Sequence, residues 1–361
     1  LRSAYFKNHT VVECAFATQL NFVVGPNGAG KTSLLDAIHY LSLTKSAFGT
    51  VDAQNIQHGH RAFAVEGHFV KHDKPYTIQC RFQQPGGKQL KSNDKLYDKL
   101  RDHIGLFPVV LTTPYDWDLI RGGSEGRRKF FDSILCQLDR DYLDALVQYQ
   151  SLLKQRNGLL RLHKEQGQLD RDLLASYDDQ LLPLGKRLFA ARTAFLETFK
   201  PNFKRYYDYF VAAEEDVQLA YVSAVSAPDF EQRFRDSLPQ DLALQRTTQG
   251  VHRDDVQFLL NGHPLKRIGS QGQQKSFTIA LRLAQFACMH EALQLKPLLL
   301  LDDIFDKLDE QRVAQLVQLM AAQHFGQVFI TDAKGTSSAT QKEQQDADQA
   351  LNKKERGQQV P

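Results

Sequence analysis

The sequence predicts an α/β protein in which a mixed β-sheet lobe accompanies a separate helical lobe. Short β-branched and aromatic runs separated by polar turns occupy much of residues 1–123, as is typical of strands. Between residues 124 and 210, apolar side chains recur at the spacing of amphipathic helices. A glycine-rich turn at residues 25–32 joins a strand-like run to a helical run. With 361 residues, 42% of them hydrophobic, the chain can bury a large core divided into two or three lobes.

The glycine-rich turn has the G-x-x-x-x-G-K-T spacing of a phosphate-binding loop. It follows the apolar run 20–24 and precedes the helical pattern 34–41, and this context argues against a chance match. In such a loop, backbone N–H groups face phosphate oxygens, the side chain of Lys31 reaches the β- and γ-phosphates, and the Thr32 hydroxyl holds Mg²⁺. We therefore predict that the chain binds a nucleoside triphosphate. The predicted cofactor-binding residues are Gly25, Pro26, Asn27, Gly28, Ala29, Gly30, Lys31, Thr32 and Ser33.

The first lobe is predicted to contain a mixed sheet near the nucleotide. Its strand-like segments are residues 4–6, 11–16, 20–24, 62–70 and 76–82. We expect Pro85-Gly86-Gly87 to end this sheet, and its turns to lie near the base and the ribose. His58-Gly59-His60 suggests a metal, but no third ligand accompanies it, which favours a solvated loop. The four cysteines are scattered, which favours neither a disulfide framework nor a zinc site.

The helical lobe carries more Lys and Arg than Asp and Glu. The positive charge is densest at Arg127-Arg128-Lys129 and between Lys154 and Lys164. Two interpretations stay open, a solvated helix face and a nucleic-acid-binding face. No sustained heptad pattern is present in this stretch, so we expect no long coiled coil.

A second motif opens a long helical pattern at residues 270–287. Ser270-Gln271-Gly272-Gln273 combines a serine at the N-cap position with a glycine and glutamines in the first turn. A hydroxyl and backbone donors exposed at a helix start can bind an anion. Taken alone, the motif is equally compatible with an ordinary helix cap, and its position before the next motif favours the anion site.

The all-apolar run 297–301 ends in two carboxylates, Asp302 and Asp303, and predicts a buried parallel strand. Asp302 could hold Mg²⁺ through water, and Asp303 could orient or deprotonate the attacking water. The alternative is an ordinary acidic turn, which the earlier phosphate loop disfavours. Thr331 ends another core strand, 328–331, and could sense the γ-phosphate. The predicted catalytic residues are Asp303, Lys31 and Thr331, and the predicted metal ligands are Thr32 and Asp302.

These motifs, followed by the Leu308-Asp309 turn, occur in an order that resembles the ABC-type ATPase head. Within that class the chain resembles the RecF family of bacterial recombination mediators, from Phe6-Lys7-Asn8 to Thr331. The segments that carry this resemblance are residues 118–122, 127–128, 155–157, 250–255, 270–274 and 299–309.

The resemblance implies an ATP-dependent homodimer in which two heads close around two ATP molecules. Each ATP would lie in the phosphate loop of one subunit and contact the other at its γ-phosphate, through Ser270 and Gly272 of the signature Ser270, Gln271, Gly272 and Gln273. Leu308 and Asp309 would form the D-loop. The resemblance also implies binding to single-stranded and duplex DNA at gaps or junctions, and, with RecO and RecR, the loading of RecA.

Three positions depart from the pattern of many ABC ATPases. Asp303 stands where a Glu is common, Thr112-Thr113 where a Gln is common, and Thr331 where a His is common. The shorter side chain of Asp303 has to reach farther for its water, so we predict slow turnover, with closure as the working state. The resemblance implies a weak, DNA-dependent ATPase.

The predicted domain organisation comprises an ATPase lobe, a helical lobe, a segment that completes the ATPase, and a disordered tail, at residues 1–123, 124–210, 211–333 and 334–361. No long apolar run and no signal-peptide pattern occur, so the expected location is cytoplasmic and nucleoid-associated, with no membrane partner. The alternative function is an ABC-class regulatory or defence ATPase that acts on nucleic acid or on a partner nuclease.

Overall fold

The computed structural model describes residues 1–49, 51–211, 214–304, 308–322 and 324–332. The predicted disordered tail lies outside these described residues. The chain divides into two compact units, one built from Leu1–Pro114 with the chain from Lys296 onward, the other from Tyr115–Leu295. The finer division into lobes at residues 123 and 210 stays a prediction. Among the described residues, no helix has both the length and the apolar character needed to cross a membrane.

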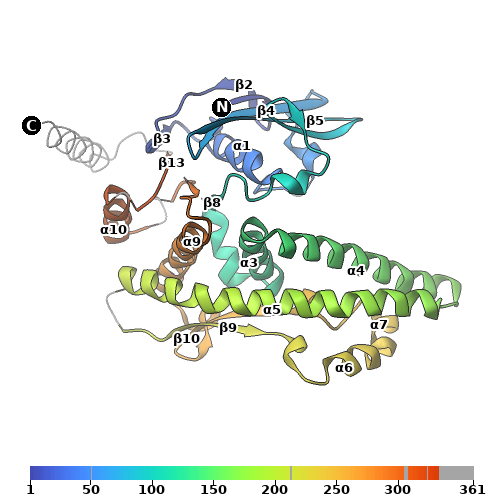
Figure 1. The fold of residues 1–361 in the computed structure, drawn as a ribbon. Helices are drawn as coiled ribbons and strands as arrows, with labels where there is room; N and C mark the ends of the chain where they lie inside the picture. Colours follow the sequence, from blue (N-terminus) through green and yellow to red (C-terminus); the bar gives the residue numbers. More distant parts are fainter. Residues whose placement is uncertain (50, 212–213, 305–307, 323, 333–361) are drawn as a thin grey trace, which may run out of the picture. The chain divides into compact units, whose positions relative to one another are not determined.

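The first unit contains a six-stranded antiparallel sheet with the strand order β2-β1-β4-β5-β6-β7 (Figure 1). Its strands are β1 (Arg2–Phe6), β2 (His9–Glu13), β4 (Ala62–Lys71), β5 (Lys74–Gln83), β6 (Gly87–Ser92) and β7 (Lys95–Leu96). The expectation that the sheet ends at Pro85-Gly86-Gly87 is wrong, because Gly87 begins β6. The sequence signal is weak there, since β6 has one fully buried apolar side chain, Leu90, among Lys and Gln. The strand predicted at 11–16 instead covers His9–Glu13.

The second sheet of this unit is four-stranded and parallel, in the order β3-β13-β12-β8. Its strands are β3 (Leu20–Val24), β8 (Val109–Thr112), β12 (Leu298–Leu301) and β13 (Val328–Asp332). Every residue of β8 is buried, as expected for parallel strands covered on both faces. Asp332 is paired with Val24, and Leu301 with Thr112, so the carboxyl ends of all four strands meet at one edge. The mixed lobe therefore consists of one antiparallel and one parallel sheet, and not of the single mixed sheet that we predicted, because β3 pairs with β13 and not with the strands around it in the sequence.

Helix α1 (Lys31–Leu43) is buried along nearly its whole length because it packs between these two sheets. Tyr40 and Leu41 join the core of the antiparallel sheet, whereas Leu35 and Ile38 join the core of the parallel sheet. A helix that is apolar on nearly all sides belongs in such an interior position. The phosphate loop, which connects β3 to α1, is thus fixed at both of its ends. This unit also contains α10 (Glu310–Ala321).

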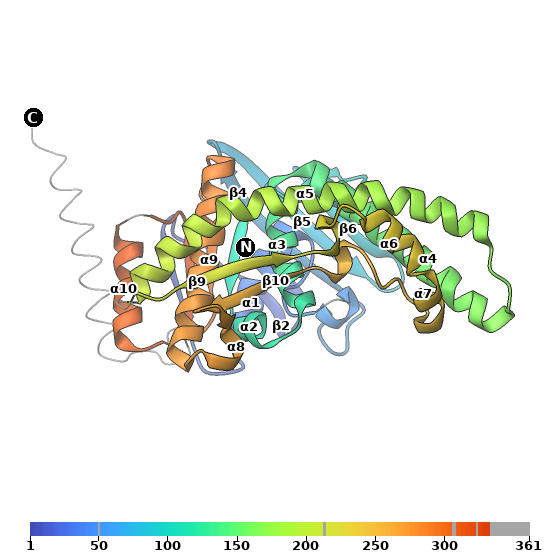
Figure 2. The same ribbon diagram turned by 90° about the horizontal axis from the view of Figure 1, so that it is seen from below.

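The second unit combines long helices with a small sheet of order β11-β10-β9. Figures 1 and 2 both show α4 and α5 side by side, with β9 and β10 running along α5. The elements are α2 (Asp118–Arg121), α3 (Ser124–Leu138), α4 (Arg140–Gln166), α5 (Arg171–Phe210), β9 (Val217–Val222), α6 (Phe230–Asp236), α7 (Leu238–Leu244), β10 (Asp255–Leu260), β11 (His263–Pro264), α8 (Leu265–Ile268) and α9 (Gln271–Leu293). Short 3₁₀ helices occur in the chain at Asp52–Asn55, Leu100–His103, Pro114–Trp117, Ala224–Ser226 and Val251–Arg253.

Two arginines of α3 and α5 are buried in ion pairs. Arg127 donates to both carboxylate oxygens of Asp255, at 2.7 and 2.9 Å. Arg192 donates to both oxygens of Asp132, at 2.9 and 3.0 Å, and to Asp254 at 3.2 Å. These bonds join α3 and α5 to the segment that leads into β10.

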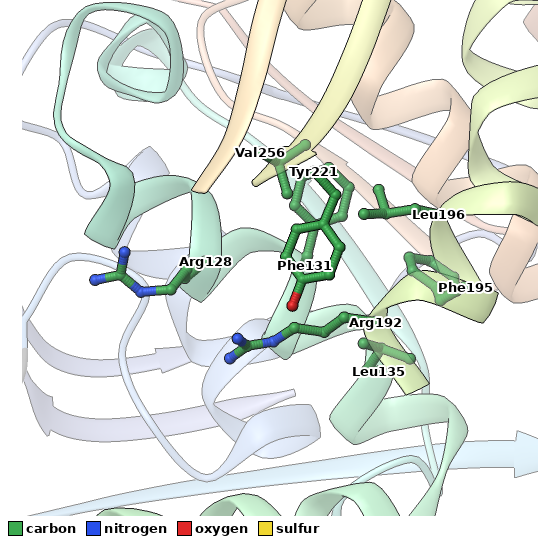
Figure 3. Close-up of a pocket in the computed structure, with 8 residues that line it drawn as sticks. All are labelled: Arg128, Phe131, Leu135, Arg192, Phe195, Leu196, Tyr221 and Val256. Atoms are coloured by element: carbon green, nitrogen blue, oxygen red, sulfur yellow. The ribbon is translucent and has the colours of Figure 1, made fainter. Parts of the chain in front are cut away.

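A cavity of about 10 Å³ lies beside Arg192, with the rings of Phe131 and Tyr221 in its wall (Figure 3). A space of this size suits a single water molecule. Its lining comprises Arg128, Phe131, Leu135, Arg192, Phe195, Leu196, Tyr221 and Val256. This cavity is part of the core of the second unit.

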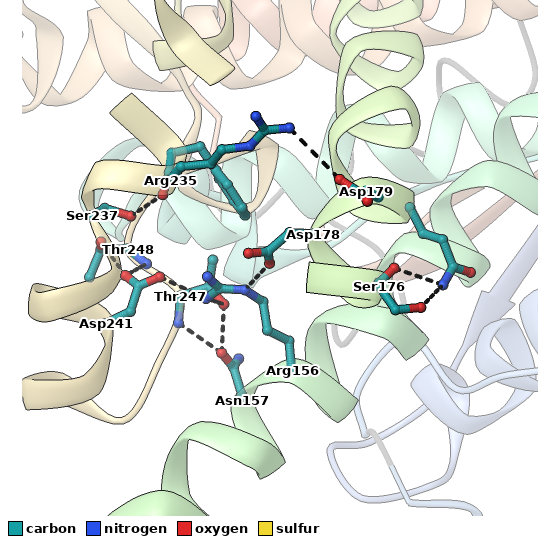
Figure 4. Close-up of polar contacts among 12 residues, drawn as sticks. Arg156, Asn157, Ser176, Asp178, Asp179, Arg235, Ser237, Asp241, Thr247 and Thr248 are labelled. Atoms are coloured by element: carbon teal, nitrogen blue, oxygen red, sulfur yellow. Dashed lines mark hydrogen bonds and ion pairs between the residues drawn. The ribbon is translucent and has the colours of Figure 1, made fainter. Parts of the chain in front are cut away.

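Arg156 of α4 is completely buried and forms the centre of a polar network (Figure 4). Its guanidinium donates to Asp178 and Asp241, at 2.6 Å each, and to the Thr247 hydroxyl at 2.9 Å. The neighbouring Asn157 accepts hydrogen bonds from the backbone and the hydroxyl of Thr247, at 2.7 and 2.8 Å. The network ties α4 to α5, α7 and the segment before β10.

These contacts correct part of the sequence interpretation of the basic stretch. Arg127 and Arg156 are neutralised inside the unit, so neither contributes to a nucleic-acid-binding face. Lys154, Arg161 and Lys164 of α4 are exposed, and both interpretations stay open for them.

Candidate functional site

The phosphate loop has the backbone conformation that its glycines permit. Gly28 and Gly30 have φ angles of 83° and 98°, in the left-handed region that favours glycine. The ammonium group of Lys31 donates to the carbonyl oxygens of Gly25 and Pro26, at 2.8 and 3.2 Å. The Lys31 side chain is therefore folded back over the loop.

The start of α1 leaves donors available. Gly30 is its N-cap residue and offers no side-chain cap, and the first turn contains no acidic residue. The first N–H groups of a helix have no partner inside it, and the helix dipole is positive at this end. Together with Thr32 and Ser33 in the first turn, these groups can bind an anion.

Asp302 faces this helix start from the end of β12. The Thr32 hydroxyl lies 3.0 Å from each carboxylate oxygen of Asp302, and the Thr331 hydroxyl donates to Oδ1 at 2.8 Å. Burial raises the pKa of Asp302, and so does the neighbouring Asp303, while the two hydroxyls oppose this rise. A hydroxyl and a carboxylate side by side supply the oxygen ligands that Mg²⁺ prefers. The predicted metal ligands Thr32 and Asp302 are thus brought together and fit that ion.

Asp303 has a φ angle of 44°, which places it in the left-handed region. Its amide donates to the Thr331 hydroxyl at 2.9 Å. Its Oδ1 atom is buried and has no hydrogen-bond partner among the described residues. A carboxylate oxygen with free acceptor capacity can accept a proton or a hydrogen bond from water. The assignment of Asp303 as the base stays a prediction that this geometry supports.

Thr331 is completely buried, and its hydroxyl connects Asp302 to the backbone of Asp303. This contact gives Thr331 a role in holding the two carboxylates in place. Its suggested role in sensing the γ-phosphate stays a prediction.

The signature residues begin α9 in the second unit. Ser270 is the N-cap, and it forms a capping box with Gln273: each side chain bonds the backbone N–H of the other, at 3.2 and 2.7 Å. Gln273 also donates to Glu215 at 2.9 Å. Ser270 and Gln271 are exposed, and Gly272 is half-buried. The motif is therefore both an ordinary helix cap and an accessible surface.

The predicted D-loop precedes α10. Asp309 is the N-cap of this helix and accepts from the amide of Arg312 at 3.0 Å. This backbone hydrogen bond, followed by the contact with the Arg312 guanidinium, lowers the pKa of Asp309. Leu308 is half-buried beside it.

Two residues in contact with the phosphate loop were not predicted as site residues, Asn8 of the turn between β1 and β2 and His9, the first residue of β2. Their side chains reach the carbonyl oxygens of Gly28 and Gly30. The sequence carries only a polar turn after a strand, which gives no sign of a contact with a segment some twenty residues away.

The described fold, with α1 between two sheets and Thr32 against the Asp302 strand, is that of an ABC-type ATPase head, and the predicted fold class is confirmed. The RecF/RecN/SMC N terminal domain family matches residues 1–355. The SMC head domain from Pyrococcus furiosus is similar in fold, with a TM-score of 0.53 at 14% identity over 92% of this chain and 88% of that chain.

The relatives with higher sequence identity reported next are all named RecF. The DNA replication and repair protein RecF of Flavobacterium johnsoniae is 45% identical over 327 residues, which cover 91% of this chain and 91% of that protein. The protein of the same name from Cytophaga hutchinsonii is 44% identical over 335 residues, covering 92% and 88%. A solved structure of the recombination mediator RecF with ATP, from the RecFOR pathway, has a TM-score of 0.86 at 28% identity, covering 93% of this chain and 91% of that chain. The chain belongs to the RecF family.

Proposed function

We propose that this protein is a DNA-binding ATPase of recombinational repair and replication-fork maintenance, in which ATP joins two copies face to face. The observation that carries the proposal is the meeting of Lys31, Thr32 and Asp302 at one end of α1. Its relatives are named DNA replication and repair protein and recombination mediator, and these names support a role in recombinational repair and replication.

In the proposed cycle the chain's own groups hold the triphosphate and prepare the water. The Lys31 ammonium group would leave the carbonyl oxygens of Gly25 and Pro26 and contact the β- and γ-phosphates. A hydrogen bond between an ammonium group and a phosphate is stronger, because both partners are charged. Thr32 and Asp302 would hold Mg²⁺, whose charge stabilises the developing negative charge on the phosphates. Asp303 would accept a proton or a hydrogen bond from the attacking water, while Thr331 holds both carboxylates.

The second half of each site would come from the partner copy. Ser270 and Gly272 of one copy would contact the γ-phosphate bound by the other, which makes two equivalent sites across a two-fold interface. The exposure of Ser270 supports this role. Loss of the γ-phosphate removes these contacts and lets the copies separate. Because the Asp303 side chain is shorter than the Glu of many related ATPases, hydrolysis is slow, and closure is the working state.

We further infer that the closed dimer binds single-stranded and duplex DNA at gaps or junctions, which stimulates its hydrolysis. It would then act with RecO and RecR to help load RecA. The RecFOR pathway named for the solved RecF structure supports these partners. DNA binding would associate the protein with the nucleoid.

The test is ATP-dependent binding to gapped duplex DNA at several salt concentrations, with Lys31→Ala beside the wild type. We expect ATP to tighten DNA binding by the wild type, and this gain to disappear in Lys31→Ala at every salt concentration. Lys45→Ala is the matched control, because it removes the same charge from an exposed position outside the loop. Equal affinity with and without ATP, or an unchanged gain in Lys31→Ala, contradicts the proposal.

A further inference from the structure

The hairpin of β1 and β2 contacts the phosphate loop at two carbonyl groups, through Asn8 of its turn and His9 at the start of β2. Asn8 Nδ2 donates to the Gly28 oxygen at 2.9 Å, and His9 Nε2 lies 3.0 Å from the Gly30 oxygen. A carbonyl oxygen only accepts, so both side chains act as donors. Neither residue is part of the phosphate-loop motif.

The donor role fixes the state of the His9 ring. Its Nε2 carries the hydrogen that points to Gly30, and Nδ1 then accepts from the Ser3 hydroxyl at 3.1 Å. Ser3 and His9 are 1% and 5% exposed, and burial lowers the pKa of His9, which favours the neutral ring. Each ring nitrogen thus has one partner, and a single tautomer satisfies both.

The ring of His9 also lies directly against the loop. A Cβ atom at Gly30 would lie 2.6 Å from His9 Nε2 and 3.1 Å from Asn8 Nδ2, so any side chain there would displace the buried His9 ring. The left-handed φ of Gly30 disfavours other residues as well. The last glycine of the loop is therefore needed both for its conformation and for the close approach of the turn.

The turn is held in place independently of the loop. The backbone N–H of Lys7 donates to the Asn55 oxygen at 2.7 Å, and its ammonium group pairs with the buried Asp36 of α1 at 2.5 Å. Next to His9, the Thr10 hydroxyl accepts from Gln57 at 3.1 Å. A support anchored in this way can impose a conformation on the loop.

We propose that Asn8 and His9 are positioning residues for the phosphate loop, which hold two of its peptide units, and with them the shape of the loop, before the nucleotide arrives. The C=O and N–H of one trans peptide unit point in opposite directions, so fixing the Gly30 carbonyl aims the Lys31 N–H away from His9. The Asn8 contact fixes the Gly28–Ala29 unit, two units earlier, whose N–H donates to the Pro26 oxygen at 3.2 Å and so closes the turn of the loop.

A loop that is already ordered loses less conformational freedom on binding, which favours affinity. The inference rests on the proposed ATP-binding function. Two measurements distinguish the ordering of the loop from the binding of ATP. Hydrogen exchange of the loop amides at residues 28–32 is followed in the nucleotide-free protein and reports how ordered the loop is. ATP affinity reports how much this order contributes to binding.

The first comparison is Asn8→Ala against Thr10→Ala. Both residues are exposed on the same hairpin and each loses one side-chain hydrogen bond, but only Asn8 touches the loop. We expect faster exchange of the loop amides and a three- to tenfold weaker ATP affinity, about the value of one hydrogen bond, in Asn8→Ala alone. The melting temperatures of both variants should stay close to that of the wild type.

The second comparison is His9→Gln against His9→Leu. The Gln side chain retains an N–H donor for the Gly30 oxygen, whereas Leu fills the space without one. We expect Gln to keep most of the ATP affinity and the slow exchange, and Leu to lose both. If both variants lower the melting temperature equally and leave the loop amides unchanged, His9 only fills space and the proposal is overturned.

Unchanged exchange and affinity in both Asn8→Ala and His9→Leu would also overturn it. If the wild type itself binds no ATP, the proposed function fails, while the exchange of the loop amides still decides whether the turn positions the loop.

Discussion

Asp303 combines an uncommon backbone conformation with a carboxylate oxygen that lacks a partner among the described residues. Asp and Asn tolerate the left-handed region better than most residues, because their short side chains bond locally. The hydrogen bond from the Asp303 backbone N–H to the Thr331 hydroxyl holds this conformation, and no described residue donates to Asp303 Oδ1. Strain and an unsatisfied acceptor next to a nucleotide site are features that fit a chemical role.

At this scale we predict the effect of Asp303→Asn. Asn keeps the shape and the backbone preference but cannot take a proton from water, so ATP hydrolysis should slow by about 10²-fold or more, and the ATP-bound dimer should last longer. Single-turnover hydrolysis and dimer lifetime measure these effects. Asp229→Asn, at an exposed aspartate of the second unit, is the control. Unchanged hydrolysis in Asp303→Asn would remove the assignment of the base.

Two helices of this protein begin with a predicted anion site, and their caps differ. Gly30 leaves the first N–H groups of α1 uncapped, whereas Ser270 caps α9 through its own hydroxyl oxygen. A hydroxyl that accepts a hydrogen bond still has its hydrogen to donate. The start of α1 thus fits the predicted phosphate site with several backbone donors, and the start of α9 fits the predicted partner contact with one exposed hydroxyl.

At the scale of this element, we predict that Ser270→Arg binds ATP normally and no longer forms ATP-driven dimers. The substitution removes the hydroxyl and adds a bulky cation at an exposed helix start, and Ser270 is not one of the phosphate-loop residues. Sedimentation with ATP and magnesium measures the dimer, and equilibrium titration measures ATP affinity.

Two further variants make this test specific. Ser270→Asp keeps an N-cap side chain but adds a negative charge toward the γ-phosphate, so it should also stay monomeric, with the stability of the wild type. Ser226→Arg, at an exposed serine elsewhere in the second unit, should dimerise normally. Normal dimers in Ser270→Arg would show that the contact with the partner is misplaced.

Across the whole molecule, charge serves different purposes in the two units. In the first unit, Lys31 and Asp302 lie at the predicted nucleotide site, and the carbonyl groups that Lys31 contacts are partners that a phosphate can replace. In the second unit, Arg156 and Arg192 are satisfied by carboxylates of their own unit. Removal of one member of such a buried pair leaves the other charge uncompensated.

We therefore predict that Arg156→Ala lowers the free energy of unfolding of the second unit by about 3–5 kcal/mol. Arg187→Ala is the matched control, because Arg187 pairs with Asp141 at the surface, where both side chains are largely exposed. It should cost less than about 1 kcal/mol. Urea unfolding followed by circular dichroism measures both variants. Equal stability of the two would refute a structural role for the buried network.

The helices and strands that matter most for the site were predictable because their signals are local. The apolar run before Asp302, the helical spacing after Lys31 and the serine cap at Ser270 each identify an element from neighbouring residues. The strand β6 was missed because its Lys and Gln residues give no such signal. The burial of Arg127 and Arg156 was also missed, since a buried arginine and an exposed one are identical in sequence.

The sequence by itself determined the phosphate loop, the two carboxylates that follow the buried strand, and the order of motifs that places the chain in its family. Spacing suffices for these features, because each depends on residues within one turn of a helix or at one strand end. Only the tertiary structure decided which partners these residues have. Thr32 contacts Asp302, and Thr331 bonds the Asp302 carboxylate and the Asp303 backbone. Asn8 and His9 bond carbonyl groups of the loop. Those contacts join residues up to 270 positions apart, and they depend on how the strands pair and how the helices pack rather than on any local pattern.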